Sequence, residues 1–285
     1  MNKILFLTLL LLGVINCTPQ QESSLRVATF NIRYDNPADS LNNWQYRKEH
    51  VYKFIKDQEL SVVSFQEVLY TQLQDLERNL PEYQFVGVGR DDGKTEGEYA
   101  CVAFLKNSFE RLDSNTFWLS ENPDSIGQKG WDAACTRIAT WAKLKDKSNG
   151  KVFMVVNTHF DHVGSEARKN SALLIINKIK EIVGDNPAVL TGDFNITDQS
   201  DAYKTITTNE FVLLDAHKKA AAVTGVDYTF QNFGKISDDS DHAKKIDFIF
   251  ITPQIKSLKS DIPSAQIDSV LYLSDHNPHI VAITF

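Results

Sequence analysis

The feature that most constrains the fold is a series of apolar runs that each stop abruptly at acidic, amide or imidazole side chains. The clearest run covers residues 188–192 and stops at Asp193, Phe194 and Asn195. A short apolar run bounded by Gly is typical of a buried strand. Asp193 and Asn195 lie two residues apart, so we expect them to point to the same side of the strand's end. Gly-Asp pairs are also common in ordinary turns, and this motif gains its weight from repetition.

Four further apolar runs end in the same kinds of residue. They stop at Asn31, at Gln66-Glu67, at Asn157-Thr158-His159 and, after Leu271–Ser274, at Asp275-His276. Another run, residues 246–251, carries Asp247 near its start. Strand ends that gather acids, amides and imidazoles at one edge of a sheet form a polar site on a rigid frame. Oxygen ligands without Cys favour Mg²⁺, Mn²⁺ or Ca²⁺ over structural zinc.

In this order the motifs resemble those of the endonuclease/exonuclease/phosphatase superfamily, the DNase I-like enzymes. The resemblance rests on Thr-Phe-Asn, Gln-Glu, Asn-Thr-His, Gly-Asp-Phe-Asn, Ile-Asp-Phe-Ile and Ser-Asp-His, at residues 29–31, 66–67, 157–159, 192–195, 246–249 and 274–276. It covers residues 25–285 as one catalytic domain. It implies an α+β fold, a four-layer α/β/β/α sandwich of two mixed sheets flanked by helices. Two halves of similar content, each with strands followed by a helix, suit the same architecture.

The resemblance also implies roles for the polar residues in hydrolysis by direct water attack. His276 is the expected general base, because an imidazole titrates near neutral pH, and Asp247 holds its tautomer. Asp193 orients the attacking water, while Asn195 and His159 donate hydrogen bonds to the phosphoryl oxygens. Glu98, at the start of a predicted strand, orients His159; from the residues alone, a solvated Glu at a loop edge remains the alternative.

The expected metal ligands are Glu67, Asn31 and Asp275, with Mg²⁺ as the cofactor and Mn²⁺ as a second candidate. Without the resemblance, the favoured interpretation of Glu67 is an acid that complements the positive end of a helix dipole at the helix N-terminus. Arg137 directly precedes the alternating strand 138–144 and is expected to bind a phosphate oxygen. No Ser lies in a nucleophile-elbow motif, so a covalent route is disfavoured.

The composition of the chain narrows the range of expected substrates. The chain of 285 residues has a formal net charge of −7 and no Lys/Arg stripe, whereas non-specific nucleic-acid binding depends on cationic side chains that neutralise phosphates. We therefore expect a small phosphorylated metabolite, sugar or lipid head group as the substrate. The alternatives are a secreted nuclease that acts on DNA or RNA and, outside enzymes, a catalytically silent binding lipoprotein.

The N-terminus predicts export. Residues 1–17 combine a charged start with an apolar run too short to span a bilayer, which is typical of a secretory signal. The signal ends at Cys17 in a stretch that resembles a bacterial lipobox, although Asn16 departs from the usual small residue. Residues 18–24 form a polar tether. We expect a monomer anchored to the bacterial envelope through a lipid on Cys17; an ordinary cleaved signal peptide and secretion are the alternative.

The remaining expectations concern local structure. Helices are expected over residues 44–58, from Glu67 to Leu80, over 165–183 and over 200–208, and strands over 83–88 and 99–105. Residues 109–120 are expected to form a strand pair. Cys101 and Cys135 either pair in an oxidising compartment or remain free as small buried hydrophobes, and the second reading is favoured.

Overall fold

The computed structural model describes residues 24–211, 213–236 and 244–285. The predicted export signal, the Cys17 anchor and nearly all of the tether therefore lie outside the described residues. Among the described helices, none has the length and apolar content needed to cross a membrane.

Two mixed sheets stack face to face at the centre of the molecule. The first sheet has the strand order β10-β12-β13-β1-β2-β4-β3, and the second has the order β5-β6-β7-β8-β11-β9. The strands of the first sheet are β1 (Leu25–Asn31), β2 (Val62–Gln66), β3 (Tyr83–Val86), β4 (Val102–Leu105), β10 (Ala222–Gly225), β12 (Lys256–Ile262) and β13 (His279–Thr284). Those of the second sheet are β5 (Phe109–Trp118), β6 (Ile138–Asp146), β7 (Val152–His159), β8 (Ala188–Asp193), β9 (Leu214–Asp215) and β11 (Asp247–Ile251).

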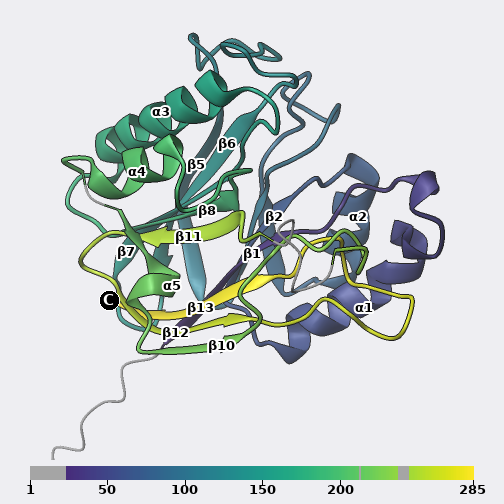
Figure 1. Cartoon of the computed structure of the whole chain (residues 1–285). Coiled ribbons are helices and arrows are strands. Elements are labelled where there is room, and N and C mark those ends of the chain that lie inside the picture. Colours follow the sequence, from purple (N-terminus) through teal and green to yellow (C-terminus); the bar gives the residue numbers. More distant parts are fainter. Residues whose placement is uncertain (1–23, 212, 237–243) are drawn as a thin grey trace, which may run out of the picture.

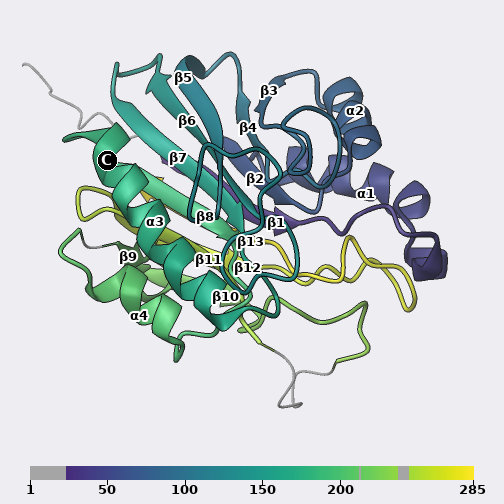
Figure 2. The same cartoon turned by 90° about the horizontal axis from the view of Figure 1, so that it is seen from above.

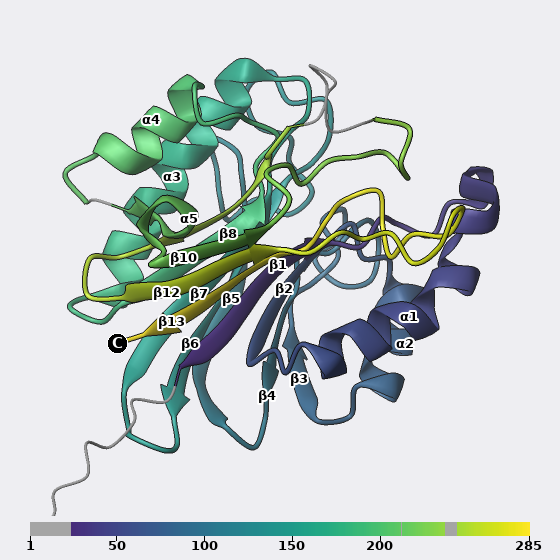
Figure 3. The same ribbon diagram turned by 60° about the horizontal axis from the view of Figure 1, so that its bottom comes forward.

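Helices cover the outer face of each sheet, as Figures 1 and 3 show. The pair α1 and α2 lies on the first sheet, and the pair α3 and α4 lies on the second; Figure 2 shows α3 over β7 and β8, with α4 beside it. The helical elements are η1 (Pro37–Asn42), α1 (Trp44–Asp57), α2 (Tyr70–Asn79), α3 (Ser165–Val183), α4 (Asp201–Thr208) and α5 (Ala216–Lys219). This arrangement confirms the predicted four-layer sandwich.

Three buried apolar clusters correspond to the three interfaces between the layers. Val27, Val155 and Ile249 belong to the cluster between the two sheets. Phe65 and Ile55 belong to the cluster under α1 and α2, and a third cluster lies under α3 and α4. Because both sheets are buried on both faces, their central strands read as continuous apolar runs, which is the pattern seen in the sequence.

Strand direction and register place the polar run-ends at one edge of the sandwich. β1 and β2 are parallel, with Asn31 opposite Gln66, and β7 and β8 are parallel, with His159 opposite Asp193. β11 runs antiparallel to β8 and places Asp247 opposite Asp193. An acid at the start of an antiparallel strand therefore reaches the same edge as residues at the ends of parallel strands.

Four local predictions differ from the structure. Residues 109–118 form one long strand with a register shift near Arg111, rather than a strand pair. Residues 271–274 form no strand: the Leu273 N–H donates to Ala265, and the Ser274 hydroxyl donates to the Asn31 carbonyl. Scattered backbone bonds to residues 265–268, with an isolated bridge between Tyr272 and Gln266, take the place of a regular strand ladder there, and the segment leads into β13.

The helix expected from Glu67 begins instead at Tyr70. Glu67 has a positive φ of 59°, which is incompatible with a right-handed helix. The strand expected over residues 99–105 is shorter, because regular pairing begins at Val102 and Tyr99 makes only an isolated bridge to Val68. Cys101 and Cys135 are both free thiols, as favoured, but only Cys101 is buried and Cys135 is half-buried.

Candidate active site

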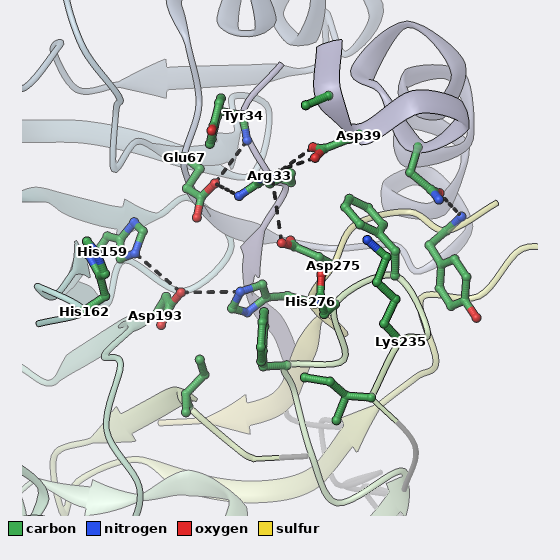
Figure 4. Close-up of a pocket in the computed structure, with 18 of the residues that line it drawn as sticks. Arg33, Tyr34, Asp39, Glu67, His159, His162, Asp193, Lys235, Asp275 and His276 are labelled. Atoms are coloured by element: carbon green, nitrogen blue, oxygen red, sulfur yellow. Dashed lines mark hydrogen bonds and ion pairs between the residues drawn. The ribbon is translucent and has the colours of Figure 1, made fainter. Parts of the chain in front are cut away.

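A cavity of about 1080 Å³ opens at this edge of the sandwich. Eight of the ten predicted site residues line it: Glu67, Glu98, Arg137, His159, Asp193, Asn195, Asp275 and His276. Asn31 and Asp247 lie behind this surface and hydrogen-bond to residues that line it. Figure 4 shows His159 and His276 on either side of Asp193.

His276 is held between two buried carboxylates. Its Nδ1 lies 2.8 Å from Asp247 Oδ2, and its Nε2 lies 3.7 Å from Asp193 Oδ2. The Asp247 backbone N–H donates to the Thr229 hydroxyl, which fixes the first residue of β11. These contacts assemble the histidine–carboxylate unit that the sequence predicts, with Asp193 facing the other ring nitrogen.

The charges around this unit bias the position of its proton. Burial lowers the pKa of His276, but the carboxylates of Asp247 and Asp193 outweigh burial and raise the pKa to about 10. Burial and the neighbouring Asp247 raise the pKa of Asp193 above its usual range. The resting site therefore favours an imidazolium on His276 beside a carboxylate that accepts protons unusually readily.

His159 presents a neutral imidazole to the other side of Asp193. Its Nε2 lies 3.5 Å from Asp193 Oδ2, and burial together with Arg137 lowers its pKa well below the ordinary value. The predicted partner Glu98 lies 3.9 Å from Nδ1 and forms its close contact, 2.8 Å, with Arg90 instead. Glu98 thus joins the site mainly through Arg90, and its orienting role stays a prediction.

Asn195 follows β8 in a left-handed conformation with a φ of 49°, which Asn tolerates better than most residues. Its backbone N–H donates to Asp193 Oδ1, and its Nδ2 donates to the Phe160 carbonyl. The side chain lines the cavity beside the carboxylate of Asp193, in reach of the region where the predicted phosphoryl group would lie.

Glu67 and Asp275 bring two carboxylates to one end of the cavity. The Arg33 guanidinium bridges them, with Nη1 at 3.8 Å from Glu67 and Nε at 3.9 Å from Asp275 (Figure 4). Burial raises the pKa of Asp275, and the charge of Glu67 raises it further. Two converging, partly desolvated carboxylates are a fitting donor set for a hard divalent cation.

Asn31 fixes this acidic end. Its Nδ2 donates to Glu67 and to Asp193, at 3.0 Å each, and its Oδ1 accepts from the Arg33 backbone N–H. In this arrangement its polar atoms already have protein partners, and its role as a metal ligand stays a prediction. A second grouping of possible ligand atoms, Asp193, Asp247 and His276, forms the hydrogen-bonded unit described above.

Arg137 lies beside His162 and is only 5% exposed. Its Nη2 lies 3.1 Å from His162 Nδ1, and its Nε lies 3.6 Å from an Asp161 oxygen. Within the described part of the chain, Nε and Nη1 have no hydrogen-bond partner. Both of these nitrogens are buried, and the Asp161 carboxylate partly neutralises the guanidinium, so Arg137 brings a largely desolvated positive charge to the cavity wall.

The family model for the endonuclease/exonuclease/phosphatase family matches residues 28–276. The chain belongs to this family. A family member from Bacteroides vulgatus is 64% identical with a TM-score of 0.90, and the match covers 93% of this chain and 100% of that one. The mannosyl-6-phosphatase of Bacteroides thetaiotaomicron is 33% identical with a TM-score of 0.86, covering 92% and 100%.

The match to a probable RNA exonuclease of Saccharomyces cerevisiae covers less of both proteins. It has 30% identity over 185 residues, which is 60% of this chain and 35% of that protein. The chain spans less than half the length of the curated relatives it matches.

Several residues that line the cavity of this endonuclease/exonuclease/phosphatase family member were not predicted from the sequence. Arg33 stands two residues after Asn31, and its position beside a predicted strand end could have indicated it. No local sequence signal points to Arg90 or to the Asn232–Lys235 turn, because long polar loops bring them to the cavity.

Proposed function

We propose that the protein is a divalent-metal-dependent phosphatase that releases inorganic phosphate from a small phosphorylated metabolite, sugar or lipid head group. The observation that carries this proposal is the position of Arg137, whose guanidinium belongs to the wall of the same cavity as His159, Asp193 and Asn195. A phosphomonoester has about two negative charges near pH 7 and several strong acceptor oxygens. A buried guanidinium suits such a group because it offers donors in a rigid fork.

The residues of the chain divide the remaining work. Arg137, His159 and Asn195 bind the phosphoryl oxygens and stabilise the charge that develops on them. Glu67 and Asp275 would hold the divalent cation, which supplies further charge neutralisation at the phosphoryl group when it is bound. Asn31 keeps Glu67 and Asp193 at a fixed separation through its two hydrogen bonds.

The electrostatics support a revised assignment of the base. The raised pKa of His276 favours its protonated form near neutral pH, and a protonated imidazole cannot accept a proton from water. Asp193 Oδ2 faces both imidazoles and is the carboxylate available to receive that proton. We therefore assign Asp193 as the base and the His276 imidazolium, held by Asp247, as a donor to the phosphoryl or leaving oxygen.

The mannosyl-6-phosphatase among the structural neighbours, at 33% identity over 92% of this chain, supports a small phosphorylated substrate. A nuclease remains the second candidate, because a probable RNA exonuclease is among the relatives. The formal net charge of −7 weighs against long nucleic acids. We further propose that the protein is exported and anchored through Cys17 and acts as a monomer.

A phosphate-release screen tests the proposal. Sugar phosphates, nucleotides, inositol phosphates and phospholipid head groups are incubated with enzyme and Mg²⁺ or with EDTA, beside a plasmid-nicking assay. Phosphate release from small monoesters that EDTA abolishes is the expected result. Efficient nicking without turnover of any monoester would favour the nuclease. Full activity in EDTA would exclude a requirement for a divalent metal.

A further inference from the structure

One wall of the cavity is a strained turn. Asn232, Phe233 and Gly234 have consecutive positive φ values of 51°, 54° and 73°. For residues other than Gly this conformation is strained and tends to occur at ligand sites. Asn tolerates this conformation, but Phe is not the residue that backbone geometry would choose, so the side chain of Phe233 needs another explanation.

Hydrogen bonds hold the turn in this shape against the Asp275 segment. The backbone N–H groups of Gln231 and Asn232 both donate to the Asp275 carbonyl, at 3.0 Å each. The Gln231 side chain donates to the Ser274 carbonyl and accepts from the Gly234 N–H. The turn is therefore rigidly coupled to the segment that carries Asp275 and His276.

Tyr272 closes the other side of the turn. A Cβ atom added at Gly234 would lie 2.0 Å from the Tyr272 hydroxyl oxygen, so only Gly fits against this ring. The Tyr272 N–H is in turn bound by the Asn42 side chain, which ties the turn to the end of η1. Such packing leaves little room for the turn to relax, and its side chains are fixed relative to the reacting centre.

The turn presents a mixed surface to the cavity. Asn232, Phe233 and Lys235 line it, and Figure 4 shows Lys235 on the side of Asp275, opposite His159 and His162. The Phe233 ring lies 5.9 Å from the guanidinium carbon of Arg47. Arg47 is fully buried and donates to the carbonyls of Asn42, Ile32, Leu273 and Arg33, so this backing is rigid.

We propose that the Asn232–Gly234 turn recognises the leaving group and that this group is a polyhydroxylated ring, that is, a sugar. The inference rests on the proposed phosphatase function. If the phosphate lies at Arg137 and His159, the rest of the ester extends toward the opposite wall. There the amide of Asn232 both donates and accepts, the Lys235 ammonium donates, and the ring of Phe233 offers an apolar face. A sugar has hydroxyl groups and C–H faces that satisfy all three.

An acyl chain would fit this wall poorly. It would cover the half-buried Asn232 amide without offering it a hydrogen-bond partner, which is costly. Sites built to bind hydroxyl groups discriminate strongly against analogues that lack them, for the same reason.

The test compares substrate selectivity between variants, and the first substitution is chosen to relieve backbone strain in the turn rather than to add it. Asn232→Gly keeps the positive φ comfortably but removes the amide. The matched control is Glu59→Gly, because Glu59 is exposed, has a φ of 48° and lies outside the cavity. The readout is the ratio of kcat/KM for a hexose 6-phosphate to kcat/KM for ethyl phosphate, which has neither hydroxyl groups nor a ring.

We expect Asn232→Gly to lower this ratio about tenfold, the scale of one net hydrogen bond, and Glu59→Gly to leave it unchanged. Phe233→Leu keeps an apolar side chain without a flat face and should lower the ratio as well. An unchanged ratio in both turn variants would overturn the role of the turn. Faster wild-type turnover of lysophosphatidic acid than of hexose phosphates would overturn the sugar assignment. If no monoester released phosphate, the proposed phosphatase function itself would be refuted.

Discussion

Replacing Asp247 with Asn distinguishes the two candidate bases of the site. The Asp247 carboxylate lies 2.8 Å from His276 Nδ1, and both side chains are buried. A hydrogen bond to a charged group in proteins contributes about 1.5–3 kcal/mol, and about 1.4 kcal/mol corresponds to one pKa unit. The substitution should therefore lower the pKa of His276 by about 1–2 units from its wild-type value of about 10.

The sign of the pH dependence follows from the protonation states. His276 is active as an imidazolium, so wild-type activity should fall as the pH rises through the raised pKa of His276. Asp193 is active as a carboxylate, so activity should rise with pH through the raised pKa of Asp193. Asp247 raises both pKa values, and its removal should shift both limbs of the kcat/KM profile to lower pH.

The assay is kcat/KM against pH for a small phosphomonoester, because this profile reports groups of the free enzyme. His276→Ala, which removes the imidazole, is the companion variant. Its kcat/KM profile should no longer fall at high pH. If His276 is instead the base, wild-type activity rises with pH toward pH 10 instead of falling. That outcome would refute the assignment of Asp193.

Three further predictions address metal, substrate and location. Glu67→Gln should weaken Mg²⁺ binding measured by titration calorimetry at least tenfold, with partial recovery of activity at high Mg²⁺; unchanged affinity would place the metal elsewhere. Arg137→Met should lower kcat/KM for monoesters by about 10- to 100-fold, because a charge-assisted hydrogen bond is lost in a buried site; near-normal kinetics would contradict its role. Cys17→Ser should release the protein from the membrane fraction, and unchanged fractionation would argue against lipidation without excluding export.

The sequence was most informative where function and strand order coincide. Asp193, His159 and Asp247 were predictable, because each ends or begins an apolar run, and sheet register then places them side by side. The four-layer fold was implied by the family resemblance that the motifs at these run-ends carry. Leu271–Ser274 misled for the opposite reason: its apolar pattern suits a strand, but it makes only an isolated bridge to Gln266 and is held by single bonds to Ala265, Asn31 and Asn42.

The other features of the site could not be predicted, because they depend on contacts between residues far apart in the sequence. The link of Glu98 to Arg90 depends on how a Gly-rich loop folds back, which no local pattern encodes. The positive φ of Glu67 was equally invisible, since a strand end before a helical pattern normally reads as a helix start. The strained turn at Phe233 is imposed by its surroundings rather than by its own sequence.

The most direct test of the account is the preference for a monoester over its matched diester. A hexose 6-phosphate and the methyl ester of the same phosphate differ by one methyl group and about one negative charge. The account predicts a kcat/KM at least about tenfold higher for the monoester, and a clearly smaller preference in Arg137→Met. Equal or faster hydrolysis of the diester by the wild-type protein would contradict the proposed phosphatase.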